Sequence, residues 1–374
     1  MQSSARSARR VRQHLQYYVS WRTPVLDALR VGLIGSGFIA KQKHLPAWKK
    51  VGKKAQVVAL CDPNVAQAEE LARAYGIPKV YNDFQQMLGV ECLNAVDICS
   101  PPRTHADLAI RSLEAGAHAL IEKPMAINAE ECDRVLAAAR VAGRKICVAH
   151  SDLFYPSFLK ARQMVKTGAI GDFRGMRIFL STPMDYITSK PEHWAHKLPG
   201  GIIGETGPHV IYMTLAFINP IRAVRVDARK QVAHFPWSPY EDYRLDLLGD
   251  EASCSVVLTY ATNRWAVQLD LWGSEGHMKF DLETQTLIVH GRADLKPVTL
   301  GLSAVKEAGQ MLGGTLGTGL TYVTGKFEST HERLVREFVD CIQKDLPTPV
   351  PPEEGREAVR VMDLLVSQLR SVSA

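Results

Sequence analysis

A lysine, a glutamate and a histidine are the residues of this sequence best suited to acid–base chemistry. Lys123 follows the apolar run His118–Ile121, where the end of a strand would direct its ammonium group at a substrate hydroxyl or carbonyl. Glu205 and His209 are four residues apart and share a face if a helix begins near Thr206. Histidine accepts a proton near neutral pH, and a neighbouring carboxylate orients its ring. We expect Lys123 and His209 to be catalytic, with Glu205 setting the tautomer of His209.

Each of these residues also has an interpretation without chemistry. A lysine at a strand end can simply lie on the surface, and a glutamate and histidine four apart can form a solvated helix face. No His-x-x-x-His pair and no His/Cys grouping indicates a metal site, so we predict none. Other histidines have no comparable setting: His44, His193, His196 and His234.

An apolar segment near the N-terminus breaks into the pattern Gly35-Ser-Gly37-Phe-Ile-Ala40. Gly35 permits a tight turn, Gly37 lets a pyrophosphate approach the backbone, and Ala40 lets a helix pack close to the strand. The second apolar run, 56–60, ends just before Asp62, at the spacing expected of the acid that binds ribose hydroxyls. An ordinary glycine turn explains the first pattern alone. Strand, turn, helix, strand and acid together predict dinucleotide binding, with NAD favoured over NADP because a carboxylate repels a 2′-phosphate.

The elements around these residues alternate between strand and helix from Leu29 to Ala149. This alternation predicts a doubly wound parallel (Rossmann) sheet, whose ligands bind at the carboxyl ends of the strands. The expected strands lie near 30–34, 56–60, 94–99, 118–121 and 145–149, and the helices include 65–75 and 104–115. The cofactor-binding candidates at the strand ends are Gly35, Gly37, Phe38, Ile39, Ala40, Asp62, Ser100, Pro101, Glu122 and Lys123.

The pattern changes beyond Ser151, where several strands follow one another without helices between them. It predicts an α+β second domain with a mostly antiparallel sheet. The expected elements are a helix over 156–166 and strands near 174–180, 223–229, 252–260 and 265–272. Residues 308–325 carry no charge but are rich in Gly and Thr, which predicts a flexible loop and no membrane span. A final amphipathic helix is expected to pack on the cofactor domain.

The chain of 374 residues is long enough for two domains. We divide it into an N-terminal arm (1–28), a Rossmann domain (29–150), an α+β domain (151–350) and a C-terminal helix (351–374). The net charge is +6, of which residues 1–29 carry +4 (five Arg against one Asp), so the body shows no electrostatic footprint for nucleic acid.

The arginine-rich first segment resembles a transit peptide, and Arg9-Arg10 resembles a twin-arginine signal. Neither is convincing, because no apolar h-region or small-residue cleavage site follows. A mobile or partner-docking arm is the preferred interpretation. Seven widely spaced cysteines without a Cys-x-x-Cys pair indicate free thiols in a reducing compartment, and we expect a cytoplasmic protein.

The order of motifs resembles the glucose-fructose oxidoreductase, inositol dehydrogenase and MocA (Gfo/Idh/MocA) family. The resemblance spans roughly residues 29–372 and is carried by these segments: Gly35-Ser-Gly-Phe-Ile-Ala40, Cys61-Asp-Pro63, Ser100-Pro-Pro-Arg-Thr-His105, Glu122-Lys-Pro-Met125, Gly168-Ala-Ile-Gly171, Trp194 followed by Gly200-Gly201, Gly207-Pro-His209, and Trp272-Gly-Ser-Glu-Gly276. The resemblance implies an NAD(P)-dependent oxidoreductase of sugars, polyols or related compounds. Its second-domain sheet would commonly make homo-oligomer contacts.

On this resemblance Lys123 and His209 form the catalytic pair, and Glu122 and His105 lie near the cofactor. The Lys123–Pro124 bond would be cis, and Trp194 and Tyr212 are candidates for substrate contact.

Three departures prevent transfer of a particular substrate. Glu205 and Tyr212 stand where the family often has Asp, and Leu153 replaces a common Arg. Two other functions use a similar scaffold, namely NAD-dependent glycosidases and a non-catalytic galactose-pathway repressor. Lys123 and His209 argue against a pure binding protein. Substrate, reaction direction and oligomer size do not follow from the sequence.

Overall fold

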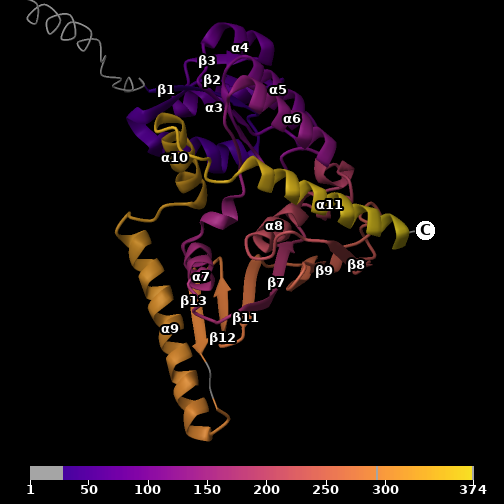
Figure 1. Cartoon of the computed structure of the whole chain (residues 1–374). Helices are drawn as coiled ribbons and strands as arrows, with labels where there is room; N and C mark the ends of the chain where they lie inside the picture. The colour runs from indigo at the N-terminus through magenta and orange to yellow at the C-terminus, as the bar shows by residue number, and fades with distance from the viewer. Residues whose placement is uncertain (1–27, 292–293, 373–374) are drawn as a thin grey trace, which may run out of the picture.

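The computed structural model describes residues 28–291 and 294–372. It contains a six-stranded sheet in the N-terminal domain and a seven-stranded sheet in the second domain, one below the other in Figure 1. This arrangement confirms the predicted α/β class with two sheets. The predicted N-terminal arm lies outside the described residues up to position 27. No described helix has the length and apolar character needed to cross a membrane.

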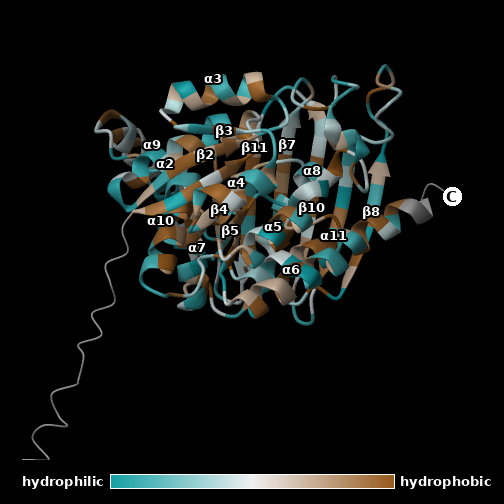
Figure 2. Cartoon of the chain, turned by 90° about the horizontal axis from the view of Figure 1, so that it is seen from above, coloured by the Kyte–Doolittle hydropathy of each residue, from teal (hydrophilic) through white to brown (hydrophobic). Residues whose placement is uncertain are grey.

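The first sheet is parallel throughout, with the strand order β3-β2-β1-β4-β5-β6 of a doubly wound fold. Its strands are β1 (Leu29–Ile34), β2 (Ala55–Cys61), β3 (Lys79–Tyr81), β4 (Ala95–Ile98), β5 (His118–Ile121) and β6 (Ile146–Val148). The apolar strands lie beneath helices, and Figure 2 shows β2 in the brown of hydrophobic residues. Strand β3 is not among the predicted strands, because it has only three residues and none is buried.

Helices connect these strands and cover the sheet. They are α2 (Leu45–Val51), which follows a π-helical turn η1 (Ala40–His44), then α3 (Val65–Tyr75), α4 (Phe84–Glu91), α5 (His105–Glu114) and α6 (Ala129–Ala142), with short 3₁₀ turns η2 (Gly52–Lys54) and η3 (Pro102–Thr104). Side chains of Asn64, Asp83 and Asn128 cap the first turns of α3, α4 and α6. These caps fix where each helix leaves its strand end.

The second sheet has the order β13-β12-β11-β7-β10-β9-β8, and only the β7–β10 pair is parallel. Its strands are β7 (Phe173–Pro183), β8 (Ala223–Arg229), β9 (Asp242–Leu248), β10 (Ser253–Thr262), β11 (Ala266–Gly273), β12 (Gly276–Asp281) and β13 (Thr286–Gly291). Helices α7 (Pro156–Lys166) and α8 (Ile203–Leu215) cover one face, where alternate strand residues such as Ile178 are buried. The other face carries exposed ion pairs such as Arg177–Asp270. The predicted open, mostly antiparallel sheet is confirmed.

The predicted flexible loop at 308–325 is wrong. A 27-residue helix, α9 (Pro297–Val323), occupies most of this segment and runs along the edge strand β13 (Figure 1). Gln310 bonds both backbone groups of Val289 in β13, at 3.0 Å (N) and 3.2 Å (O). The glycines lowered the expected helix propensity, but contact with an exposed sheet edge outweighs propensity in this segment.

The last two helices return to the Rossmann domain. Helix α10 (Thr330–Gln343) packs on α2, and α11 (Pro352–Val372) packs on α6 and β6 on one side and on α8 and β8 on the other. The apolar stripe of α11, from Ala358 to Leu369, is buried. Helix α11 therefore fixes the position of α8 relative to the strand ends of the first sheet.

Candidate active site

Lys123 leaves the carboxyl end of β5 through a cis bond to Pro124 and reaches across to α8. Its Nζ donates to Oε1 of Glu205 at 2.6 Å and to the backbone oxygen of Glu205 at 2.9 Å. Burial favours the protonated form of Glu205, but Lys123 and His209 together lower the pKa of this carboxyl. An ammonium group has three donors, so one N–H of Lys123 remains for a substrate oxygen.

His209 is oriented by Asp152, which corrects the prediction that Glu205 sets its tautomer. Oδ2 of Asp152 lies 2.7 Å from Nδ1 of His209. The hydroxyl of Tyr212 donates to the same Oδ2 at 2.8 Å, and its oxygen lies 2.7 Å from Nδ1. Burial favours protonation of Asp152, yet His209 and Tyr212 lower its pKa, so it is a carboxylate. In the neutral imidazole Nδ1 therefore carries the proton, and Nε2 presents a lone pair.

Asp152 is not among the predicted site residues, although its position shortly after β6 indicates a strand-end location. The predicted candidates follow four strands, and none of them follows β6, which leads through His150 into the 3₁₀ turn η4 (Ser151–Phe154). All five of these ends meet at one edge of a doubly wound sheet.

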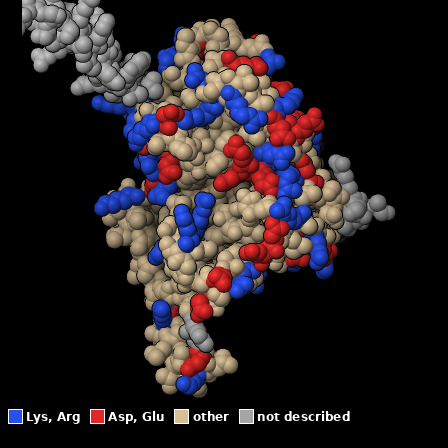
Figure 3. Space-filling model, viewed as in Figure 1, with Lys and Arg blue, Asp and Glu red and all other residues tan. Residues whose placement is uncertain are grey.

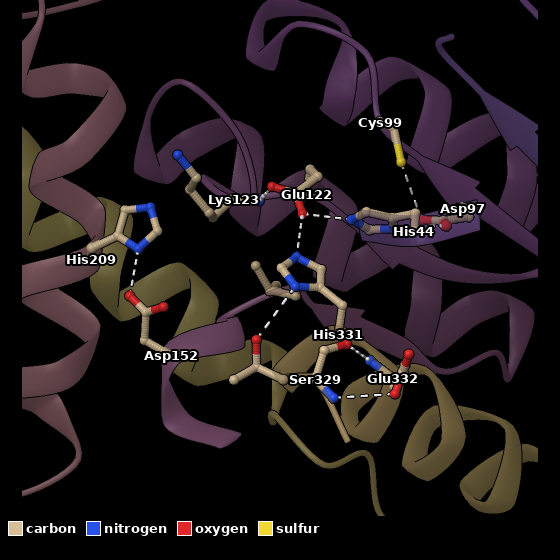
Figure 4. Close-up of polar contacts among 12 residues, drawn as sticks. His44, Asp97, Cys99, Glu122, Lys123, Asp152, His209, Ser329, His331 and Glu332 are labelled. Atoms are coloured by element: carbon tan, nitrogen blue, oxygen red, sulfur yellow. Dashed lines mark hydrogen bonds and ion pairs between the residues drawn. The ribbon is translucent and has the colours of Figure 1, made fainter. Parts of the chain in front are cut away.

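Figure 4 shows Lys123 and His209 directed toward the same space between the Rossmann strand ends and α8. Glu205 and His209 are one turn apart on that helix, and Lys123 is bonded to the first of them. His209 is also the one residue among the thirteen of α8 that is not buried. The arrangement offers a hydrogen-bond donor and a proton acceptor to a single small molecule.

The glycine turn fits a dinucleotide. Gly35 has φ +96°, and a Cβ there would lie 2.7 Å from the backbone oxygen of Cys99, so only glycine is tolerated. A Cβ on Gly37 would meet nothing within 4 Å, which leaves that side of the backbone open to a phosphate. Asp62 accepts from the backbone N and the hydroxyl of Ser36 at 2.7 and 2.8 Å and from the backbone N of Asn64. A carboxylate has about four acceptor positions, so one remains for a ribose hydroxyl.

Two family models match this chain. The model of the oxidoreductase family with an NAD-binding Rossmann fold matches residues 29–150, and that of the GFO/IDH/MocA C-terminal domain matches residues 158–293. The chain belongs to the Gfo/Idh/MocA oxidoreductase family. The first domain is accordingly an NAD(P)-binding Rossmann domain.

Individual relatives in the Gfo/Idh/MocA family are distant. D-apiose dehydrogenase from Paraburkholderia graminis is 28% identical over 193 residues, which are 52% of this chain and 50% of that protein. D-glucoside 3-dehydrogenase from Escherichia coli is 33% identical over 144 residues, which are 38% of this chain and 41% of that protein. The chain thus spans half or less of the length of these two relatives.

Among solved structures, the WlbA dehydrogenase from Bordetella pertussis in complex with NADH and UDP-GlcNAcA has a similar fold. Its TM-score is 0.76 at 19% identity, and the match covers 92% of this chain and 96% of that chain. At this identity the likeness shows the shared fold alone.

The other cofactor candidates lie at the same edge as the glycine turn. The ring of His105 lies 2.8 Å from the backbone oxygens of both Ser100 and Pro124, so it ties the loop after β4 to the loop after β5. Pro101 directly precedes the short turn η3 as its N-cap residue. Ile39 is half-buried, whereas Phe38 is exposed beside the glycine turn.

Tyr212, predicted to contact substrate, is instead buried, with its hydroxyl between Asp152 and His209. Burial and Asp152 raise its pKa well above the usual value, so it stays a neutral donor. Its ring stacks on the buried ring of His150, with centroids 4.3 Å apart. Tyr212 therefore positions His209. Trp194 begins the turn η5 (Trp194–Lys197) with an exposed ring stacked on His193.

His44, which the sequence analysis set aside, is fully buried between two carboxylates. Its Nδ1 lies 2.8 Å from Asp97 and its Nε2 lies 2.7 Å from Glu122 (Figure 4). Burial lowers the pKa of His44, but Asp97 more than compensates and raises it well above its usual value. Burial opposes ionisation of Glu122 as well, yet His331 and His44 bring its pKa well below the usual range. Trp48 donates to the same Asp97 oxygen at 2.6 Å.

This network explains the place of Glu122, predicted near the cofactor. Its Oε2 accepts from the backbone N of Lys123 at 3.2 Å, so the buried network supports the backbone that carries the lysine. Two groups of side chains in this network have the spacing of metal ligands, and His44 belongs to both. One group is His44, Glu122 and His331, and the other is His44, Asp97 and Cys99. Both ring nitrogens of His44 are already paired with carboxylates, which accounts for the spacing without an ion.

Proposed function

We propose that this protein is an NAD-dependent dehydrogenase that oxidises a secondary hydroxyl of a sugar, polyol or related derivative, or reduces the corresponding carbonyl. The observation that carries the proposal is the pairing of Lys123 and Glu205, which brings the lysine beside the exposed edge of His209 at the cofactor end of the sheet. The sugar dehydrogenases among the relatives support the substrate class.

The chain's own groups account for the proton in this reaction. Oxidation of an alcohol removes a hydride from the carbon and a proton from the hydroxyl. A bound nicotinamide would accept the hydride, so a side chain of the protein has to accept the proton. Nε2 of His209 accepts that proton, while Asp152 stabilises the resulting imidazolium. The remaining N–H of Lys123 donates to the same substrate oxygen and stabilises the charge that develops on it.

The test is a screen for NAD(P)H formation with sugars, inositols and their phosphates, run beside a His209→Ala control. Turnover that the control lacks supports the dehydrogenase. Glycoside cleavage without net NADH would instead indicate the NAD-dependent glycosidase. Cofactor binding with no reaction of either kind would indicate a regulatory protein and contradict the proposal.

We propose NAD as the preferred cofactor, with NADP disfavoured. Asp62 stands at the ribose end of the glycine turn, and neither Pro63 nor Asn64 supplies a cation for a 2′-phosphate. Asp62→Ser should reduce the preference for NADH over NADPH, as measured by fluorescence titration with each cofactor. Tighter binding of NADPH than of NADH to the wild-type protein would contradict this reading of Asp62.

We also propose a cytoplasmic homo-oligomer that contacts copies of itself through the second-domain sheet and binds neither nucleic acid nor membrane. The unpaired cysteines support a reducing compartment. The small charge of the chain beyond the N-terminal segment gives no footprint for nucleic acid. Sedimentation of the full chain measures its assembly state.

A further inference from the structure

Helix α9 turns its polar face toward its own domain and its apolar face toward solvent. Its half-buried residues, which lie toward β13, are polar or small: Thr299, Ser303, Glu307, Gln310, Gly314, Thr318 and Thr321. Its large apolar residues point away from the sheet, and none of the 27 residues is buried. A surface helix ordinarily does the opposite, with its apolar stripe on the core and its polar face in water.

The exposed apolar residues follow a regular spacing. Val298, Leu302, Val305, Gly309, Leu312, Leu316, Gly319 and Val323 are separated alternately by four and three residues. We call this row the α9 seam. Its six large side chains are 64% to 87% exposed. An added Cβ on Gly309 or Gly319 would meet nothing within 4 Å. A repeat of 3.5 residues is the pattern of a helix that packs along another helix.

The composition of α9 adds a second reason for a missing neighbour. The helix contains six glycines, each of which disfavours a helix by about 1 kcal/mol relative to alanine, so its intrinsic propensity is low. Contact with β13 provides one face of support. The exposed seam is a second face on which packing against a neighbour would stabilise helix α9.

We propose that the α9 seam packs against the α9 seam of a second copy of this chain. A two-fold interface needs a patch that complements itself. The seam meets that need, because it carries no charge and repeats regularly over seven intervals. Lys306 and Glu307 are the only charged residues of the helix, and neither belongs to the seam. Figure 3 shows the projecting lower part of the molecule as mostly uncharged surface.

The charges also distinguish this partner from a membrane surface. A helix that lies in a bilayer interface carries a polar face rich in Lys and Arg, whereas α9 has one lysine and places its polar face on its own sheet edge.

The size of the seam suits a modest interface. A helix of 27 residues is about 40 Å long and about 10 Å wide, so a pair buries roughly 400 Å² on each copy. Leu320 is exposed beside the seam and widens this contact toward the roughly 1,000 Å² in total that a specific interface needs. The second-domain sheet continues directly from α9 through β13, so the same two-fold can add contacts of the sheet edge.

Analytical ultracentrifugation of the full chain tests the proposal. The wild type should sediment above its 41.4 kDa monomer mass at micromolar concentration. The double variant Leu312→Glu/Leu316→Glu should sediment at a lower mass than the wild type, with the dissociation constant of the seam contact raised at least tenfold. The matched control Ala304→Glu/Thr315→Glu adds the same charge at exposed positions off the seam and should assemble like the wild type. Leu312→Ala/Leu316→Ala, which keeps helix-forming residues, should weaken assembly to a smaller extent.

NADH titration of every variant verifies the fold of the Rossmann domain, far from the seam. A wild type that stays monomeric overturns the proposal, whether or not it floats with phosphatidylcholine/phosphatidylserine vesicles. An oligomer that the seam variants leave unchanged overturns it too, and would assign assembly to another surface such as the open sheet.

Discussion

Helices α8 and α9 belong to the same domain but differ in what surrounds them. Twelve of the thirteen residues of α8 are buried, and the remaining one, His209, faces the candidate site. Helix α9 has no buried residue and turns its apolar side chains outward. A helix held on all sides can keep Glu205 within 2.6 Å of Lys123, because close packing leaves little freedom to shift. A helix held on one side depends on a further surface for its order.

The largest effect expected from this difference is on catalysis. Lys123→Ala and His209→Ala should each lower kcat by about 10² to 10⁴, the range for a lost proton donor or acceptor. Lys306→Ala, which removes the lysine of α9, should leave kcat unchanged. Steady-state kinetics and NADH titration provide the check, and NADH affinity should stay near wild type. A kcat within twofold of wild type for either site variant would remove that residue from the proposed mechanism.

The same chemical change should have opposite effects on the stability of the two helices. A Cβ on Gly204 of α8 would lie 2.7 Å from the backbone oxygen of Pro199 and 2.8 Å from Cβ of Leu198. Gly204→Ala should therefore destabilise by about 1 to 3 kcal/mol, the range for overpacking. Gly317 of α9 has open space, so Gly317→Ala should stabilise by about 0.5 to 1 kcal/mol. Urea denaturation measures both, and equal effects would contradict the contrast in packing.

Removing the carboxylate of Glu205 should matter less than removing the lysine it holds. In Glu205→Gln the backbone oxygen still accepts from Lys123, so kcat should fall only about tenfold, below the range for a lost proton donor. The comparison is with Lys123→Ala under the same assay. If the two variants lost activity equally, Glu205 would itself contact the substrate or move its proton.

The smallest expected effect concerns His150, whose buried ring stacks on Tyr212 of α8. Burial, and then the neighbouring His209, lower its pKa to about 3. The unfolded chain binds this proton near pH 6.5 and the folded chain only near pH 3, so between these values the free energy of unfolding falls as the pH falls. The slope is at most about 1.4 kcal/mol per pH unit. His150→Phe, which preserves the stacked ring, should flatten the decrease between pH 7 and 5 in urea titrations. An unchanged slope would show that His150 is not the group responsible.

Periodicity and strand-end chemistry predicted much of this molecule. The parallel sheet follows from βαβ alternation, because parallel strands require crossover helices, and the strand ends that carry Asp62 and Lys123 therefore meet at one edge. The spacing of Glu205 and His209 predicted their shared helix face. It did not predict their partners, because Lys123 and Asp152 reach α8 from loops distant in sequence.

The remaining errors have similar causes. The spacing of Glu205 and His209 predicts that they pair with each other. In the fold Lys123 bonds Glu205 and Asp152 bonds His209. The glycines of α9 predict a loop by propensity, and propensity does not include the contact of this segment with β13. His44 has no local signal at all, since its two carboxylate partners lie 53 and 78 residues away.

The contact of His331 with Glu122 has a consequence for biosynthesis. His331 lies at the start of α10, 3.8 Å from a carboxylate in the Rossmann core, and α10 itself covers α2. The first domain therefore lacks part of its covering until nearly the whole chain has left the ribosome. Domains generally fold as units from the N-terminus during synthesis. Here the nascent Rossmann sheet should keep an apolar flank exposed until α10, about 200 residues further along the chain, has been translated. A fragment that ends at the domain boundary should consequently be prone to aggregation, however complete its cofactor motifs are.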